Sequence, residues 1–206
     1  MSAIETEKQL RNMYLPAKER AVKKQMPRLD HHCRNFLALA RFAVLSTCDT
    51  EGNMDASPRG GEAGFIKVID DNTVIIPDWT GNNRLDTFSN ILSTRRIGAI
   101  FMVPGVDEAL RINGAASLRN DEQFTSLCEV NGRFPKLVVH IAVKEAYLHC
   151  AKAIMRAELW APRAKVERKV LPTMNEMLRD QIGQTDPAEP QEVMYARHTT
   201  ELYSNK

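Results

Sequence analysis

Apolar and polar positions alternate with a strand period through the middle of the chain, from residue 42 to residue 116. Clusters of glycine, proline, asparagine and aspartate interrupt this pattern at short intervals, as turns do. Gly52, in the turn at residues 49–53, suits a hairpin position with positive φ. The pattern predicts strands at residues 42–47, 55–59, 64–69, 73–77, 97–103, 109–118 and 136–150, with a short helix inserted from about residue 83 to residue 92. Many short antiparallel strands with one inserted helix describe a small barrel.

Helical periodicity flanks this central region on both sides. Leu10, Met13 and Tyr14 share one face of a helical pattern, and Asp30 can cap a further helix. We therefore expect a helical cover over about residues 3–40. Further helices are expected at residues 121–129, 152–159 and 172–181, and residues 192–203 of the loose tail can dock on a partner. The expected architecture is one domain, residues 1–206, of the α+β class and mostly β, with a C-terminal helical tail over about residues 152–206.

Composition and charge exclude several classes of function. The 28 lysines and arginines and 26 aspartates and glutamates leave a net charge of +2, so the chain has no global field for gathering nucleic acid. Its apolar runs are too short to cross a bilayer, and it lacks the apolar core of a signal peptide, so we expect a cytoplasmic protein with no membrane partner. The four cysteines are far apart and form no C-x-x-C pair, which predicts neither a metal site nor a disulfide framework.

The chemically richest segment is residues 77–84, where a strand ends, a polar turn follows and a helix is expected to begin. A helix N-terminus offers unpaired N–H groups and a partial positive charge, both of which suit a phosphate. Arg84, expected in the first helical turn, adds a planar fork that can bind a phosphate bidentately. Thr80, Asn82 and Asn83 supply neutral hydrogen bonds at the same place. An ordinary capped turn with a solvated arginine explains the local pattern equally well.

Two further basic residues lie on neighbouring predicted strands. Arg59 ends a strand that we expect to lie beside the strand ending at Pro77, so that it converges with Arg84 on one dianion. Lys67 alternates with apolar neighbours on the next strand and can point into the same pocket. The alternatives are a surface arginine beside a Gly-Gly turn and a lysine on a solvated strand face.

Several sequence runs resemble one known family. They are D-A-S-P-R-G at 55–60, G-F-I-K-V-I-D at 64–70, I-P-D at 76–78, G-N-N-R-L-D at 81–86, L-R-I-N-G at 110–114, H-C-A-K-A at 149–153 and L-W-A-P at 159–162. Together they resemble the FMN-binding split-barrel proteins of the pyridoxamine 5'-phosphate oxidase-like group, and most closely a bacterial subfamily with a G-N-N-R-x-D signature. The resemblance covers roughly residues 30–181. It implies a split β-barrel of antiparallel strands with flanking helices.

The resemblance also implies a site and a partner. Flavin mononucleotide (FMN) would lie between the two subunits of a homodimer. The candidates for its phosphate and ribityl chain are Arg59, Thr80, Asn82, Asn83 and Arg84. Main-chain atoms around Asp78 and Trp79 would border the isoalloxazine ring, where the Trp79 ring either stacks on the flavin or only covers the turn. Arg111 and Lys152 are candidates for the pyrimidine edge of the flavin or for a substrate anion.

Two departures from the family pattern bear on the substrate. The pyridoxamine phosphate oxidases proper carry a lysine after the helix-start arginine, and this chain has Leu85 there. Their C-terminal Arg-x-His type motif has no counterpart, because Arg197 and His198 are adjacent rather than spaced. The resemblance therefore does not extend to a vitamin-forming oxidase.

The function expected from this resemblance is that of an FMN-dependent oxidoreductase. It would move electrons between a nicotinamide donor, NAD(P)H, or another small organic donor and oxygen or a small acceptor, with the flavin supplying the redox chemistry. No Ser-His-Asp or paired-carboxylate arrangement is found, and no catalytic residue is assigned. The alternatives are a flavin-binding sensor, carrier or storage protein without turnover, and a split barrel that uses haem or a deazaflavin. Haem would require an axial ligand from His140, His149 or His198.

Overall fold

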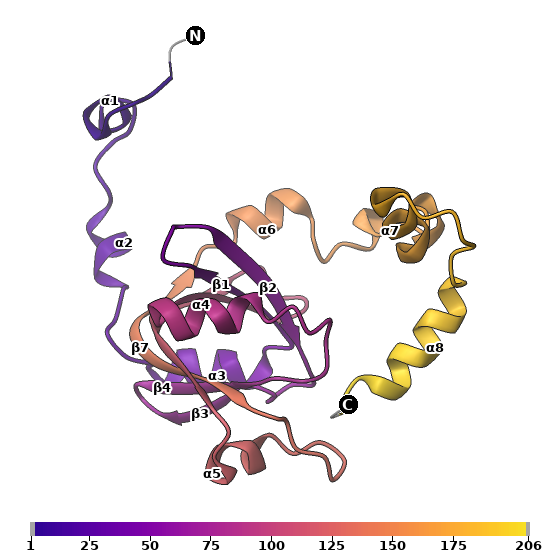
Figure 1. Ribbon diagram of the computed structural model, residues 1–206. Coiled ribbons are helices and arrows are strands. Elements are labelled where there is room, and N and C mark those ends of the chain that lie inside the picture. The colour runs from indigo at the N-terminus through magenta and orange to yellow at the C-terminus, as the bar shows by residue number, and fades with distance from the viewer. Residues whose placement is uncertain (1–2, 205–206) are drawn as a thin grey trace.

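The computed structural model describes residues 3–204 and contains a curved seven-stranded antiparallel sheet with helices around it (Figure 1). The sheet order is β2-β1-β5-β6-β7-β4-β3, and every pairing is antiparallel. No backbone pairing among residues 3–204 joins the edge strands β2 and β3, so the barrel is split rather than closed. The strands are β1 (Phe42–Cys48), β2 (Met54–Gly60), β3 (Lys67–Asp70), β4 (Thr73–Pro77), β5 (Arg96–Met102), β6 (Ala109–Arg119) and β7 (Val138–His149).

A bulge in the middle of the two longest strands helps the sheet to curl. The register of β6 against β7 shifts between Asn113 and Gly114, and a bulge bends a strand and increases its twist. A Cβ atom added at Gly114 would lie 2.2 Å from the carbonyl oxygen of Ala142 on β7. Only glycine fits this close approach of two backbones, so the residue type fixes the place where the sheet bends.

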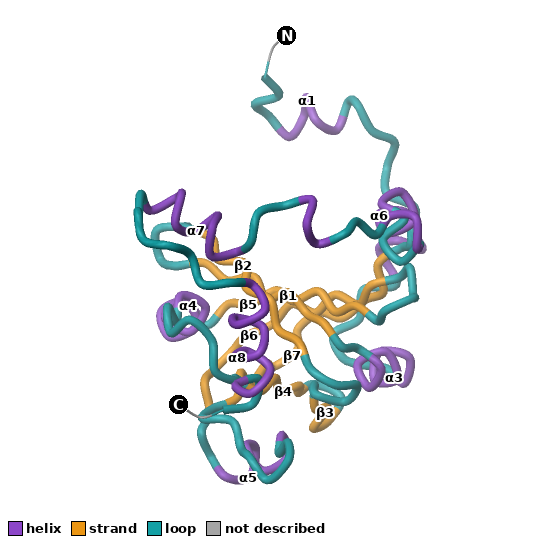
Figure 2. The backbone as a smooth tube through the Cα atoms, turned by 90° about the vertical axis from the view of Figure 1, so that its right-hand side faces the viewer, coloured by secondary structure: helices purple, strands orange, loops and turns teal. Residues whose placement is uncertain are grey.

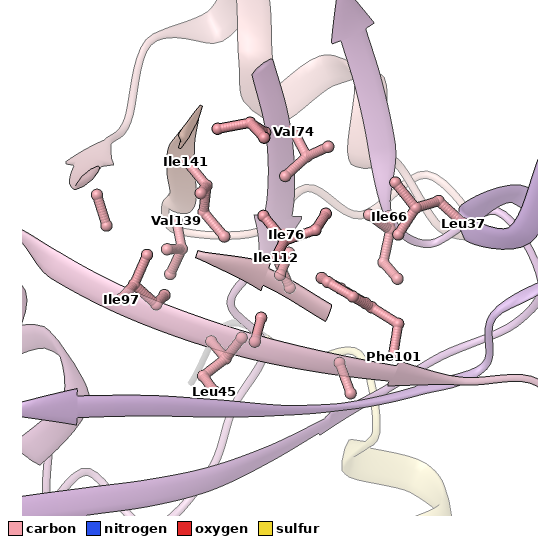
Figure 3. Close-up of a cluster of buried hydrophobic side chains, with 14 of the residues drawn as sticks. Leu37, Leu45, Ile66, Val74, Ile76, Ile97, Phe101, Ile112, Val139 and Ile141 are labelled. Atoms are coloured by element: carbon pink, nitrogen blue, oxygen red, sulfur yellow. The ribbon is translucent and has the colours of Figure 1, made fainter. Parts of the chain in front are cut away.

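The core lies inside the curve of the sheet. Figure 3 shows side chains from separate strands, including Leu45, Ile76, Phe101 and Ile141, pointing toward one another, and each of these is fully buried. The alternation in β1 explains this arrangement, because its buried residues take every second position. The core is therefore formed by residues at every second strand position, as the predicted strand period implies.

Two helices cover the sheet. Helix α3 (His31–Leu39) begins at the cap Asp30, whose carboxylate accepts a hydrogen bond from Cys33 N–H at 2.8 Å, and it buries Cys33 and Leu37. The predicted cap is confirmed. Helix α4 (Asp86–Thr94) packs on β1 and buries four residues, Thr87, Phe88, Asn90 and Ile91.

The helical cover expected over residues 3–40 is reduced to α3. Helices α1 (Glu7–Arg11) and α2 (Glu19–Lys23) have no buried residue among their described side chains, and α1 stands away from the sheet (Figures 1 and 2). The apolar face predicted at Leu10, Met13 and Tyr14 exists, but all three side chains are exposed. Such short helices gain little stability on their own, and within residues 3–204 this apolar face is left exposed.

The remaining helices follow β6 and β7. They are α5 (Glu122–Thr125), the 3-10 turn η1 (Ser126–Cys128), α6 (Lys152–Ala157), the 3-10 turns η2 (Pro162–Ala164) and η3 (Arg168–Val170), α7 (Met174–Ile182) and α8 (Gln191–Glu201). Helices α6 to α8 run outside the sheet, and the chain then returns toward it (Figures 1 and 2). Within residues 3–204, every helix is too short or too polar to span a bilayer.

Candidate functional site

A cavity of about 860 Å³ lies where three separate segments of the chain meet. Its walls are formed by β2, by the loop and helix start at residues 77–89, and by the C-terminal residues Leu202, Tyr203 and Ser204. Lys136 and Leu137, just before β7, complete the lining together with Leu92 and Leu118. The volume falls in the range of sites that enclose a small molecule or a cofactor.

The sheet brings Arg59 to this cavity by a different route from the predicted one. We expected the strand of Arg59 to neighbour the strand that ends at Pro77, and this expectation is wrong. Four strands, β1, β5, β6 and β7, lie between β2 and β4 in the sheet order. Curvature of the sheet brings the two together across the gap of the barrel, and both line the cavity. The order of strands along the sequence did not reveal this contact, because the contact depends on how the whole sheet curls.

Arg59 lines the cavity and has a buried donor without a partner. Its Nη1 donates to Ser57 Oγ at 2.6 Å and to the Pro58 carbonyl oxygen at 2.8 Å. Its Nε is buried and has no hydrogen-bond partner within residues 3–204. The guanidinium carbon lies 5.7 Å from the centroid of the Phe88 ring, at the start of α4. Because a buried N–H without an acceptor is costly, this geometry suits an acceptor supplied by a ligand.

The electrostatics around Arg59 combine burial with two carboxylates. Burial lowers the pKa of Arg59, and the charges of Asp78 and Asp55 oppose that shift. Burial likewise raises the pKa of Asp78, against the opposing charges of Arg59 and Lys136. The cavity thus holds an incompletely solvated cation beside a carboxyl group that resists ionisation. An anionic ligand would satisfy the cation in such a place.

The loop before α4 differs from the predicted helix start. Residue 83 was expected to open the helix, but α4 begins at Asp86, because Asn83 (φ 58°) and Leu85 (φ 62°) are left-handed and cannot continue a right-handed helix. Arg84 therefore precedes the helix instead of lying in its first turn. Its N–H donates to Asn82 Oδ1 at 3.1 Å and its exposed Nε donates to Asp86 Oδ2 at 2.7 Å.

The same loop leaves the N-terminus of α4 open. No side chain in the described part of the chain caps this helix. The backbone is left-handed at Leu85 and right-handed at Asp86. This alternation of backbone conformation turns successive N–H groups toward a common point, as in anion-binding nests. The N–H groups at this end, with the helix dipole behind them, favour a negative charge.

Three contacts at the cavity were not predicted. Thr87 Oγ1 donates to Asp55 Oδ2 and so ties α4 to β2. Thr80 Oγ1 donates to the carbonyl oxygen of Ser204, and the Trp79 ring meets the Tyr203 ring edge-on, with centroids 5.1 Å apart at 87°. The C-terminal tail thus contacts its own chain here, and its docking on a partner stays a prediction. No local sequence signal gives such a contact across 124 positions.

The site residues predicted from sequence fall into two groups. Arg59, Asp78, Trp79, Thr80, Asn82, Asn83 and Arg84 all line the cavity. The other three candidates, Lys67, Arg111 and Lys152, do not line it.

Each of these three has another setting within one chain. Lys67 pairs with Ile75 at the far edge of the sheet, where it does not point into the same pocket as Arg59. The Arg111 guanidinium lies 5.2 Å from the Tyr147 ring centroid, and Lys152 is exposed at the start of α6. Their roles toward a cofactor stay predictions.

The curved, unclosed antiparallel sheet defines a split-barrel protein, and its cavity is lined by both arginine and aspartate side chains. The sequence model of pyridoxamine 5'-phosphate oxidase matches residues 29–150, and the chain belongs to this family. A comparison with curated proteins finds no match.

Several solved structures are similar in fold. HupZ of Group A Streptococcus is 19% identical, with a TM-score of 0.48 over 58% of this chain and 93% of that chain. An FMN-binding protein from Syntrophomonas wolfei is 16% identical, with a TM-score of 0.42 over 57% of this chain and 88% of that chain. The conserved hypothetical protein Rv2991 from Mycobacterium tuberculosis is 14% identical, with a TM-score of 0.45 over 69% of this chain and 94% of that chain.

Proposed function

We propose that this chain binds FMN in the cavity and acts as an FMN-dependent oxidoreductase. The observation that carries the proposal is the buried, unpaired Nε of Arg59, which lines the same cavity as the uncapped start of α4. An arginine donor and a helix N-terminus are two groups that hold a phosphate in proteins. Membership of the pyridoxamine 5'-phosphate oxidase family makes FMN the phosphate-bearing molecule to test first.

The residues present fit this cofactor. Arg59 Nε and the N–H groups at the start of α4 would hold the phosphate, with Asn82 and Asn83 in reach of the ribityl chain as neutral partners. Trp79 would supply apolar area beside the flavin ring. Bound FMN would supply the electron transfer, as flavins do. The protein would bind the flavin, orient it and shield it from water.

Asp78 bears on charge balance at the site. Burial raises the pKa of Asp78, and the charges of Arg59 and Lys136 oppose that shift, so Asp78 is part of the charge balance that a bound phosphate would meet. The thiols also fit a reducing compartment, because all four cysteines are free. We place the proposed activity in the cytoplasm, with a small molecule as substrate and NAD(P)H as the first electron donor to test.

We further propose that the protein is a homodimer and that the cofactor site is completed at the subunit interface. The support is the amount of apolar surface left outside the barrel. Leu15 is 91% exposed in the N-terminal arm, and Val166 is 74% exposed between α6 and α7. Large exposed apolar area indicates a partner surface, and a second copy would meet it by two-fold symmetry. Arg111 and Lys152 would then be offered to the cavity of the partner.

A visible absorption spectrum of the purified protein, before and after addition of FMN, tests the cofactor. Flavin bands that remain with the protein after gel filtration support the proposal, whereas a haem Soret band or a deazaflavin spectrum would overturn it. The variants Arg59→Ala and Arg84→Ala measure the contribution of each arginine to FMN affinity. We expect the larger loss of affinity from Arg59→Ala, because Arg84 is exposed and already paired with Asp86.

Turnover and assembly need their own measurements. Steady NAD(P)H-dependent reduction of the bound FMN distinguishes an oxidoreductase from a sensor, carrier or storage protein. Light scattering of the FMN-loaded protein gives the mass in solution. A monomer that holds FMN as tightly as any dimer present would overturn the shared-site proposal.

A further inference from the structure

The last described residues, 202–204, return to the candidate flavin site. Leu202, Tyr203 and Ser204 line the cavity alongside the loop that follows β4. The contact joins residues 124 positions apart, and it is made directly after α8. In this position the C-terminal segment 202–204 forms one wall of the cavity.

The segment is anchored at several points. The Thr80 hydroxyl donates to the Ser204 carbonyl oxygen, and Ser204 Oγ donates back to Thr80 Oγ1 at 3.2 Å. Ser204 is only 9% exposed, and Met194 on α8 is only 5% exposed. Buried side chains on both sides of residues 202–203 hold the wall in place.

These contacts change the role of Thr80. A hydroxyl group has one proton to donate, and Thr80 gives it to Ser204. While the segment is docked, Thr80 cannot also donate to a phosphate. Its hydroxyl therefore positions the C-terminal segment, and the adjacent Trp79 completes an aromatic corner with Tyr203.

We infer that the C-terminal segment 202–204 decides which second reactant reaches the flavin, and that Tyr203 is its specificity-determining side chain. The inference rests on the proposed function. The Tyr203 ring is a rigid wall of the cavity, and its edge-on contact with Trp79 fixes its position. We expect such a wall to hinder reactants with two fused rings more than those with a single ring.

One experiment tests the docking of the wall without any flavin. The chain has two tryptophans, so Trp160→Phe leaves Trp79 as the sole fluorophore of this kind. In that background, Tyr203→Ala should shift the Trp79 emission to longer wavelength and increase its quenching by acrylamide. Tyr195→Ala is the matched control, because Tyr195 is a tyrosine on the preceding helix α8, is 50% exposed and does not line the cavity. Equal spectra for the two variants would overturn the docking of the segment.

A second experiment tests selection of the reactant. FMN bound to the protein is reduced by light in the presence of EDTA and then mixed with p-benzoquinone or with the two-ring quinone menadione. In each reaction the reduced flavin passes two electrons and two protons to the quinone, which becomes a hydroquinone while the flavin becomes oxidised. We expect Tyr203→Ala to speed the menadione reaction by about tenfold and the benzoquinone reaction by less than about twofold, the scale of steric selection by a pocket.

The outcomes of the quinone experiment are distinct. Tyr203→Phe should behave as wild type, because it keeps the ring. An equal acceleration of both quinones, or none, in a variant that still binds FMN would overturn the role of Tyr203. A wild-type chain that binds no FMN would overturn the proposed function together with this role, and the fluorescence experiment would then report separately whether the wall itself is docked.

Discussion

Replacing Arg59 by methionine should separate ligand binding from folding. The substitution keeps much of the side-chain volume and removes a half-buried cation whose buried Nε is unpaired. An unsatisfied buried donor costs about 1–3 kcal/mol, and the two Nη1 bonds that are lost contribute about 1 kcal/mol each. We therefore expect the free energy of unfolding of the ligand-free protein to stay within about 1 kcal/mol of wild type. The loss of a charge-assisted contact to phosphate, about 2–3 kcal/mol, should weaken FMN binding by about 30- to 150-fold.

Urea unfolding without FMN and titration of flavin fluorescence measure the two effects on the same sample. Arg96→Met provides the control, since Arg96 is an exposed arginine of β5 that does not line the cavity. It should change neither quantity appreciably. Unchanged FMN affinity in Arg59→Met would refute the phosphate role of Arg59. A loss of more than about 3 kcal/mol of stability without ligand would show instead that the arginine is a structural ion.

Three further predictions concern the sheet, the cavity and the thiols. Gly114→Ala should lower the free energy of unfolding by about 2–4 kcal/mol, because the new Cβ would lie 2.2 Å from a backbone oxygen of β7. Urea unfolding measures this loss, and an unchanged unfolding midpoint would contradict it. Burial raises the pKa of Asp78 above its ordinary value of 3.8, so protonation of Asp78 favours the folded state. The stability this contributes is complete below pH 3.8 and is lost as the pH rises through the raised pKa. Wild type should accordingly lose stability relative to Asp78→Asn across that window in unfolding curves at stepped pH, and parallel curves would refute this. Burial raises the pKa of Cys33 and Cys128 to about 11, so iodoacetamide at pH 8 should label the exposed Cys150 first, as peptide mass spectrometry can verify.

The strands were predictable because their signal is local. The strand at residues 73–77 has the bounds predicted for it, and the hairpin before β2 has Gly52 at positive φ as expected. Burial on every second residue leaves a period of two in the sequence, whatever the strands pair with. Much of the loop at the candidate site was found in the same way, because polar residues between a strand and a helix stand out.

The features that were missed depend on long-range geometry or on residues without a turn signal. The helix start was misplaced because Leu85, a residue type rarely found at positive φ, is left-handed. Strand β3 begins at Lys67 rather than at residue 64, because Gly64 has φ of +86° and ends a turn there. The sheet order and the return of the C-terminal segment involve contacts that no local pattern records.

The gap in the barrel gives the proposed ligand a mechanical consequence. Strands β2 and β4 face one cavity but share no backbone hydrogen bonds in the sheet order, so side chains alone span the seam between them. A phosphate held by Arg59 of β2 and by the start of α4, which follows the loop after β4, would add a second link between the two, beside the bond from Thr87 to Asp55. Ligand binding would then also stabilise the fold. The ligand-free protein would open first at the β2 edge.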